Sequence, residues 1–270
     1  MFSLLEIMNK KNPLHKGREG LKGKVTLVTG ATGGIGRAIC ETFAELGSFL
    51  YVCDVKGTKK LADEINTRHG EPRSSPAHCD ISNKEEVRAM YQNIAKEKKG
   101  VDIIINNAAV HGNGDFPAIS YDEFLKTIKI DLSGAMYCTL MALPHMIENK
   151  WGRILFTAAP LSSSGIPSPY LAGKSGFIGL AKYISKKYGA NGIRTFALVL
   201  RHCDTPMIRR VMKARGKDVK KGIEELHKKS KTGKMITPKE VAEIYAHFSL
   251  ATSPRVNGLT LLSDGGITYL

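Results

Sequence analysis

Short apolar runs alternate with longer amphipathic stretches along most of the chain. Runs rich in β-branched and aromatic residues predict buried strands at 24–30, 49–54, about 76–79, 101–106, 152–158, 194–200 and 259–263. Segments with helical spacing predict helices at 35–47, about 58–69, about 84–97, 121–149, 169–188 and 238–250. This alternation predicts an α/β fold in which helices cover both faces of a doubly wound parallel sheet, giving three αβα layers.

The pattern indicates a single domain over residues 22–270. Residues 1–21 are polar and basic, and Pro13, Gly17 and Gly20 punctuate them, so we expect an N-terminal extension outside the core. The apolar stretch at the start precedes its charges, which is the reverse of a secretory signal. No apolar run approaches the roughly 20 residues of a membrane helix, so we expect no membrane partner.

Charge and cysteine content narrow the possible partners and location. The net charge of +15 favours anionic partners, such as phosphorylated substrates, coenzyme A esters, carboxylates or nucleic acid, although a solvated lysine-rich surface explains it equally well. The five cysteines are scattered and form no CxxC pair, which indicates neither a zinc site nor a disulfide framework. We therefore expect no bound metal and a cytoplasmic location.

A glycine-rich turn, Thr29–Gly36, joins the first strand to the first helix. Glycine permits positive φ and a close backbone approach to a pyrophosphate, and the following helix offers free N–H groups to it. The strand before the turn and the helix after it are the context that a dinucleotide site requires. The cofactor-binding residues predicted here are Gly30, Thr32, Gly33, Gly34, Ile35 and Gly36.

Asp54 ends the second strand, twenty residues after Gly34. A carboxylate at this place accepts hydrogen bonds from the adenosine ribose 2′-hydroxyl and repels a 2′-phosphate. The sequence therefore favours NAD over NADP as cofactor, with Lys56 nearby as the one opposing charge.

Tyr170 and Lys174 are four positions apart in a predicted helix, which places them on one face. A free tyrosine has a pKa of about 10, which is high for a base near neutrality. A neighbouring ammonium favours the phenolate and lowers this pKa, so the pair suits proton exchange with an alcohol or carbonyl oxygen. These two residues are the predicted catalytic pair.

Several motifs in order resemble the short-chain dehydrogenase/reductase family over about residues 22–267. They are TGxxxGxG at Thr29–Gly36, Asp80-Ile81, an NNAG-like segment at Asn106–Ala109, YxxxK at Tyr170–Lys174, Asp204–Met207, Asn257-Gly258 and Asp264–Gly266. The resemblance implies a Rossmann fold and a homo-oligomer, most often a tetramer, for which helices 121–149 and 169–188 offer apolar faces. It also implies further cofactor contacts from Asp80 and Ile81 to adenine, from Asn107 and Ala108, from Lys174 to the nicotinamide ribose, and from Thr205 to the carboxamide.

The chain departs from the family pattern at the oxygen-handling end of the site. The family usually has a serine at the end of the fifth strand and an asparagine in the preceding helix, where this chain has Ala159 and Asp131. Loss of a donor to a developing oxyanion typically costs about 10² to 10³ in rate. The hydroxyl of Thr157, or one from Ser162-Ser163-Ser164, is a candidate replacement.

Further departures concern the strand ends and the segment that follows the sixth strand. Ala109 replaces the last glycine of NNAG, and Leu200-Arg201 replaces the usual Pro-Gly, which places Arg201 and His202 near the nicotinamide end. The segment at about 204–234 resembles the family's substrate lid, and within 208–234 it has eleven lysines or arginines against three acids. Such a lid suits a phosphate or carboxylate, or is a solvated helix pair.

The sequence as a whole favours an NAD(H)-dependent oxidoreductase that interconverts a secondary alcohol and a ketone, on an anionic small molecule. Ala159 favours an alternative on the same fold, namely C=C or C=N reduction or a cofactor-assisted elimination. The charge favours another, a degenerate family member that binds RNA or another polyanion, against which the intact glycine turn, Asp54, Tyr170 and Lys174 argue. Fold resemblance alone does not decide between them.

Overall fold

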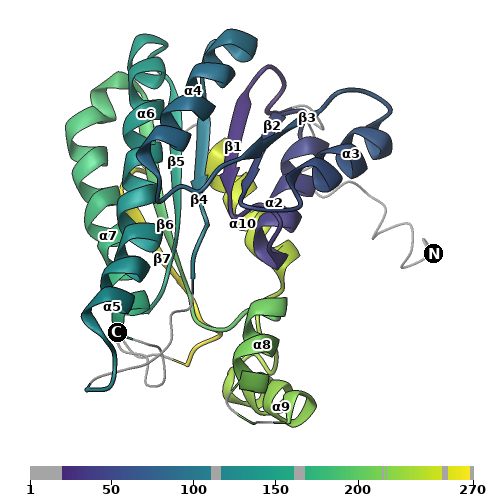
Figure 1. The fold of residues 1–270 in the computed structure, drawn as a ribbon. Coiled ribbons are helices and arrows are strands. Elements are labelled where there is room, and N and C mark those ends of the chain that lie inside the picture. The colour runs from purple at the N-terminus through teal and green to yellow at the C-terminus, as the bar shows by residue number, and fades with distance from the viewer. Residues whose placement is uncertain are drawn as a thin grey trace.

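A seven-stranded sheet forms the centre of the molecule (Figure 1). This computed structural model describes residues 20–110, 117–160, 168–214, 216, 218–250 and 255–267. The strands are β1 Val25–Thr29, β2 Phe49–Asp54, β3 Ser74–His78, β4 Ile103–Asn106, β5 Gly152–Ala158, β6 Ile193–Leu200 and β7 Leu259–Ser263. All six pairings are parallel and the strand order is β3-β2-β1-β4-β5-β6-β7. The order reverses between β1 and β4, the place where such sheets bind ligands.

Helices cover both faces of this sheet, as the sequence predicts. One face carries α2 Gly34–Glu45, α3 Thr58–His69 and α10 Pro238–Leu250, and the other carries α4 Lys84–Lys98, α6 Ala135–Glu148 and α7 Ser168–Tyr188. Alternate residues of each strand enter opposite cores: Leu27 packs with α4, α6 and α7, whereas Val28 packs with α2 and α10. The predicted three-layer Rossmann arrangement is therefore confirmed.

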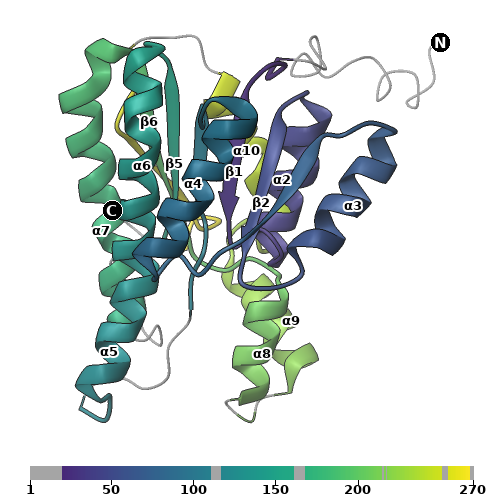
Figure 2. The same ribbon diagram turned by 45° about the horizontal axis from the view of Figure 1, so that its top comes forward.

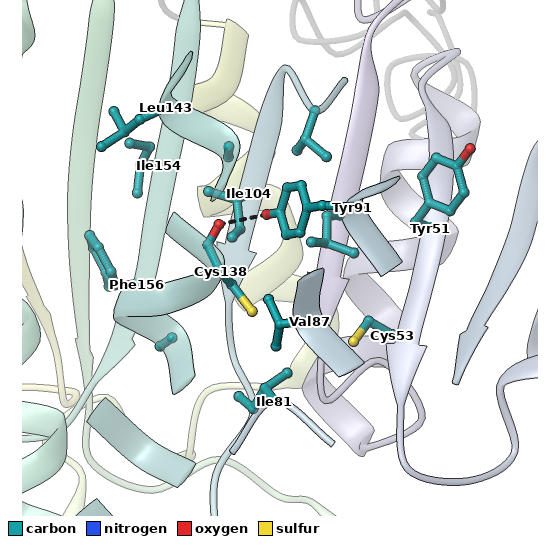
Figure 3. Close-up of a cluster of buried hydrophobic side chains, with 14 of the residues drawn as sticks. Tyr51, Cys53, Ile81, Val87, Tyr91, Ile104, Cys138, Leu143, Ile154 and Phe156 are labelled. Carbon is teal, nitrogen blue, oxygen red and sulfur yellow. Dashed lines mark hydrogen bonds between the residues drawn. The ribbon is translucent and has the colours of Figure 1, made fainter. Parts of the chain in front are cut away.

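The core beneath α4 and α6 holds most of the cysteines. Cys53, Cys79 and Cys138 are buried there, and the Tyr91 hydroxyl donates a hydrogen bond to the carbonyl oxygen of Cys138 at 2.7 Å (Figure 3). All five cysteines are free thiols. Within the described ranges, no three histidine, cysteine or acidic side chains come together as a metal site. None of the helices described has both the length and the apolar composition of a membrane span.

The stretch predicted as one helix over 121–149 is a continuous rod with an irregular middle. It consists of α5 Tyr121–Ile128, a π-helical turn Lys129–Gly134 and α6. Gly134 ends the wide turn against the chain after β3, where a Cβ would lie 2.6 Å from the carbonyl oxygen of Ile81. The wide turn places Asp131 in the interior of the molecule, and π-turns are frequent at functional sites.

Two short helices, α8 Pro206–Ala214 and α9 Val219–Lys229, extend beyond the strand ends, as Figures 1 and 2 show. They hold a small core of their own with the loop after α9, made of Met212, Ile223, Leu226 and Met235. This pair occupies the region predicted as a basic lid. A short 3-10 helical turn, Gly189–Asn191, joins α7 to β6.

Candidate active site

A cleft of about 870 Å³ opens at the carboxyl ends of the central strands. Its volume lies within the range of about 300 to 1,000 Å³ that is usual for small-molecule and cofactor sites. Every residue predicted from sequence to bind cofactor or act in catalysis lines it, with the exception of Gly36. These residues are Gly30, Thr32, Gly33, Gly34, Ile35, Asp54, Asp80, Ile81, Asn107, Ala108, Tyr170, Lys174 and Thr205.

The glycine turn has the features that a pyrophosphate site needs. Gly30 has a φ of +63°, and a Cβ on it would lie 2.7 Å from the Cα of Ala108. A Cβ on Gly36 would overlap the carbonyl oxygen of Gly30, so this glycine allows the helix to pack against its own turn. Gly33 caps α2 without a side-chain acceptor for the first-turn amides. Those amides and the helix dipole are suited to an anion.

Asp54 lies at the edge of the cleft with its carboxylate fixed by three donors. Thr32 donates to Oδ2 through its backbone amide at 3.1 Å and through its hydroxyl at 2.7 Å, and the amide of Val55 donates to Oδ1 at 2.8 Å. A carboxylate has about four acceptor sites, so it retains capacity for a ribose hydroxyl. Lys56 also lines the cleft, which brings a positive charge to the same end.

Hydrogen bonds join the ends of β1 and β4 beneath the cleft. The hydroxyl of Thr29 accepts from the amides of Asn107 and Ala108, both at 3.1 Å. The Asn107 side chain donates to the carbonyl oxygens of Thr29 at 3.1 Å and Gly30 at 3.2 Å. Asn107 therefore fixes the glycine turn against the neighbouring strand, which explains why an amide stands at this place.

Lys174 is 1% exposed, and its ammonium donates to the carbonyl oxygen of Ala108 at 2.9 Å. Burial lowers the pKa of Lys174, and the charge of Asp131 opposes that shift. Tyr170 is partly buried one helical turn earlier and lines the same cleft. The predicted pair is therefore brought together with the cofactor turn.

The pKa of Tyr170 moves in the direction opposite to the one predicted from Lys174. Burial raises it first, and the Asp131 carboxylate raises it further. The sequence places the Lys174 ammonium one helical turn from Tyr170, but it does not reveal that the Asp131 carboxylate also acts on this phenol. The expectation of a lowered phenol pKa is thus wrong for this structure, and the physical cause is desolvation together with a like-charge effect.

Asp131 is fully buried in the π-helical turn, facing α7. Its Oδ1 accepts from the Val110 amide at 2.8 Å, whereas the buried Oδ2 has no hydrogen-bond partner among the described residues. Burial raises the pKa of Asp131 to about 6, while Lys174 and the Val110 hydrogen bond act to lower it. The environment of Oδ2 is unusual, because most buried side-chain oxygens have a hydrogen-bond partner.

The position of the family serine holds Ala159, which is buried and apolar. Of the candidate replacements, Thr157 lines the cleft, and its hydroxyl lies 2.8 Å from that of Tyr245 and 3.4 Å from the Asn107 side-chain oxygen, to which it donates. These bonds leave Thr157 poorly placed to serve a substrate oxygen. Ser162-Ser163-Ser164 lies outside the described residues.

The basic residues of the lid region are arranged differently from the expectation. Arg210 of α8 lines the cleft, whereas Arg201 and His202 are not among its described lining residues. His202 lines a separate cavity of about 670 Å³ between α10 and β7, where burial lowers its pKa to about 4. Arg209 is paired with Asp204 through two hydrogen bonds of 2.9 and 2.7 Å.

Several lining residues carry no sequence signal of their own. Cys53 and Cys79 directly precede the predicted contacts Asp54 and Asp80. Only this position at the strand ends indicates from sequence that they line the cleft. Other lining residues that sequence reasoning missed are Val55, Val110, Ile130 and Val211. Only the fold brings the lid helix and the π-helical turn to the strand ends.

Comparison with known proteins agrees with this architecture. The family model described as enoyl-(acyl carrier protein) reductase matches residues 30–268. The oxidoreductase UcpA of Escherichia coli is 32% identical over 255 residues, which cover 92% of this chain and 95% of that protein. The crystal structure of levodione reductase superposes with a TM-score of 0.85 at 26% identity, covering 91% of this chain and 98% of the other.

A 3-oxoacyl-[acyl-carrier protein] reductase from Brucella melitensis, solved with bound NAD, has a TM-score of 0.81 at 25% identity and covers 96% of both chains. The motifs, the sheet order and the cleft agree with these matches over nearly the whole chain. The protein is therefore an oxidoreductase of the short-chain dehydrogenase/reductase family, whose members use nicotinamide cofactors.

Proposed function

We propose that this protein is an NAD(H)-dependent enzyme that interconverts a secondary alcohol and a ketone on a small anionic molecule. The observation that carries the proposal is the convergence of Tyr170 and Lys174 with Asp54 and the glycine turn in one cleft. A nicotinamide cofactor supplies or accepts the hydride in such a site. The protein itself must hold the cofactor and move one proton.

Each end of the cofactor has suitable residues in the cleft. The free amides at the start of α2 suit the pyrophosphate, and the Asp54 carboxylate suits a ribose 2′-hydroxyl. Lys174, whose ammonium is directed by the Ala108 carbonyl oxygen, is the candidate for the second ribose. Thr205, at the base of the lid, is the candidate for the carboxamide.

Tyr170 is the candidate acid and base at the reacting oxygen. Its phenol gives a proton to a carbonyl oxygen in reduction and takes one from an alcohol in oxidation. Lys174, one helical turn along α7 with a buried ammonium, is the candidate to offset the charge of the phenolate that reduction leaves behind.

The charge of the lid supports an anionic substrate. Arg210 lines the cleft from α8 and is exposed, so it is available to a carboxylate or phosphate on a bound molecule. Further lysines and arginines lie on α8 and α9, where they raise the local concentration of anions.

The test is turnover with NADH or NAD⁺ across a panel of neutral and anionic ketones and alcohols, using parent protein and Tyr170→Phe. We expect Tyr170→Phe to lower kcat by at least about a hundredfold and to change cofactor affinity by less than about threefold, because the proton matters in the transition state. Turnover that survives in Tyr170→Phe would show that the catalytic assignment is wrong. Absence of turnover on every carbonyl would contradict the proposed reaction.

A second candidate is reduction of a C=C bond on the same site. Ala159 favours it, because this position lacks the hydroxyl that would hold a reacting oxygen and because Thr157 is engaged by Tyr245. Including α,β-unsaturated substrates in the panel distinguishes the two reactions by product analysis.

A further inference from the structure

The buried carboxyl group of Asp131 has a definite place beside the catalytic pair. It lies in the π-helical turn, and a Cβ on Gly173 would be 3.0 Å from its Cβ. Gly173 stands between Tyr170 and Lys174 in α7, so the acid packs directly against the segment that carries both. The absence of a side chain at Gly173 permits this close approach.

Asp131 is held in one orientation and is only half satisfied. The Val110 amide fixes Oδ1 at 2.8 Å, while Oδ2 is buried without a hydrogen-bond partner in the described part of the chain. An amide such as asparagine would present an N–H donor at this oxygen's place. Asp131 instead presents a hydrogen-bond acceptor when its carboxyl group is ionised and an acid proton when it is protonated.

The groups that surround Asp131 determine what its charge acts on. Lys174 and Tyr170, both on α7, are the titratable side chains with which it interacts. The chain after β4 meets it with the backbone of Val110, and Lys126 and Lys129 on its own helical rod are exposed. A negative charge here therefore opposes the phenolate of Tyr170 and favours the ammonium of Lys174.

We propose that Asp131 is a positioning residue whose charge keeps the proton on Tyr170, so that the site reduces carbonyl groups over a wider pH range than it would with an asparagine there. This inference rests on the proposed function. In reduction, the carbonyl oxygen takes the phenolic proton while the carbonyl carbon receives the hydride supplied by the reduced nicotinamide. The resulting phenolate then regains a proton from water, which completes the balance.

The direction of the pH dependence follows from the two acids. Burial raises the pKa of Asp131 to about 6, so above that pH its carboxylate is charged and adds to the burial that raises the pKa of Tyr170. Reduction needs the protonated phenol and fails when pH rises past the Tyr170 pKa. Removing the charge of Asp131 should therefore lower the pH above which reduction fails.

The experiment compares parent protein with Asp131→Asn, which keeps the side-chain size and the acceptor for Val110. The first measurement is ultraviolet titration of tyrosinate in protein without added cofactor, with Tyr170→Phe made in each background so that subtraction isolates Tyr170. We expect the Tyr170 midpoint to fall by about one pH unit or more in Asp131→Asn. Asp102→Asn, which removes a buried carboxylate at the opposite end of β4, should leave it unchanged.

The second measurement is the pH profile of kcat/KM for carbonyl reduction, whose alkaline limb should move by the same amount. An unchanged Tyr170 midpoint in Asp131→Asn overturns the inference, whatever the activity. A shifted midpoint with no turnover of any ketone supports the effect of Asp131 on the Tyr170 proton and contradicts the proposed function instead. If Asp131→Asn fails to fold, Asp131→Ala takes its place, and an unchanged Tyr170 midpoint in that variant overturns the inference.

Discussion

Replacing Asp54 with asparagine should bring NAD and NADP to similar affinities. The side chain accepts from the Thr32 amide and hydroxyl and from the Val55 amide, and asparagine keeps an oxygen for some of these donors. Asp54 is half-buried at the edge of the cleft, so its charge is only partly screened. The change therefore removes a charge with little loss of shape.

The expected magnitude follows from two effects. A carboxylate repels each negative charge of a neighbouring 2′-phosphate by about 1 to 2 kcal/mol at intermediate screening. Because this phosphate carries nearly two charges, the total repulsion is about 2 to 4 kcal/mol. Loss of a charged acceptor for the ribose hydroxyl weakens NAD by about 1 kcal/mol. The two effects lower the ratio of the NADP and NAD dissociation constants together, and since about 1.4 kcal/mol is a tenfold change, this ratio should fall by at least about a hundredfold.

Titration calorimetry with both cofactors measures this ratio directly. Asp63→Asn is the matched control, because it removes the same charge from the exposed surface of α3 and should leave the ratio within about twofold. Lys56→Ala should shift the ratio in the opposite direction, since Lys56 lines the cleft. A ratio that changes less than about threefold in Asp54→Asn refutes the assignment of Asp54 to the ribose.

Three further changes test other parts of the site and surface. Lys174→Ala should lower both kcat and NAD affinity, because the buried ammonium is proposed to assist proton transfer at Tyr170 and to hold the cofactor ribose. A fall in kcat without a fall in calorimetric NAD affinity, or the reverse, would contradict this double role. Arg210→Ala should raise KM about fivefold for anionic substrates and leave it unchanged for neutral ones, an effect that added salt reduces. Leu140→Glu on α6 should dissociate a homo-oligomer in light scattering, because Leu140 is 49% exposed beside Met136 at 41%; a monomeric parent at micromolar concentration would refute the predicted tetramer.

Much of the fold follows from hydrophobic periodicity. The strand at 49–54 and the helices at 58–69 and 238–250 coincide with β2, α3 and α10, because each apolar face has a matching core to enter. The exception is the rod at 121–149. A π-helical turn changes the hydrogen bonding of one segment without changing the apolar spacing, so periodicity does not reveal it.

The cofactor half of the site was more predictable than the oxygen-handling half. Glycine positions and Asp54 depend on the local path of one strand, turn and helix, which the chain order specifies. The partner of Thr157 is Tyr245, 88 residues away, and the neighbour of Lys174 is an acid from another helix. Such contacts depend on how distant helices pack, and a pattern read along one segment does not contain them.

The buried charges also bear on whether this fold is used as a surface for nucleic acid or another polyanion. Such a surface needs exposed cations, and the lysines and arginines of α8 and α9 would serve it as well as they would serve an anionic substrate. Lys174 and Asp131 are different, because each has lost its hydration in the interior beside the cleft. Burial of a charged group costs several kcal/mol, and a polyanion on the surface recovers none of that cost. A site that moves a proton through Tyr170 does use both charges, and this makes the enzymatic interpretation the stronger of the two.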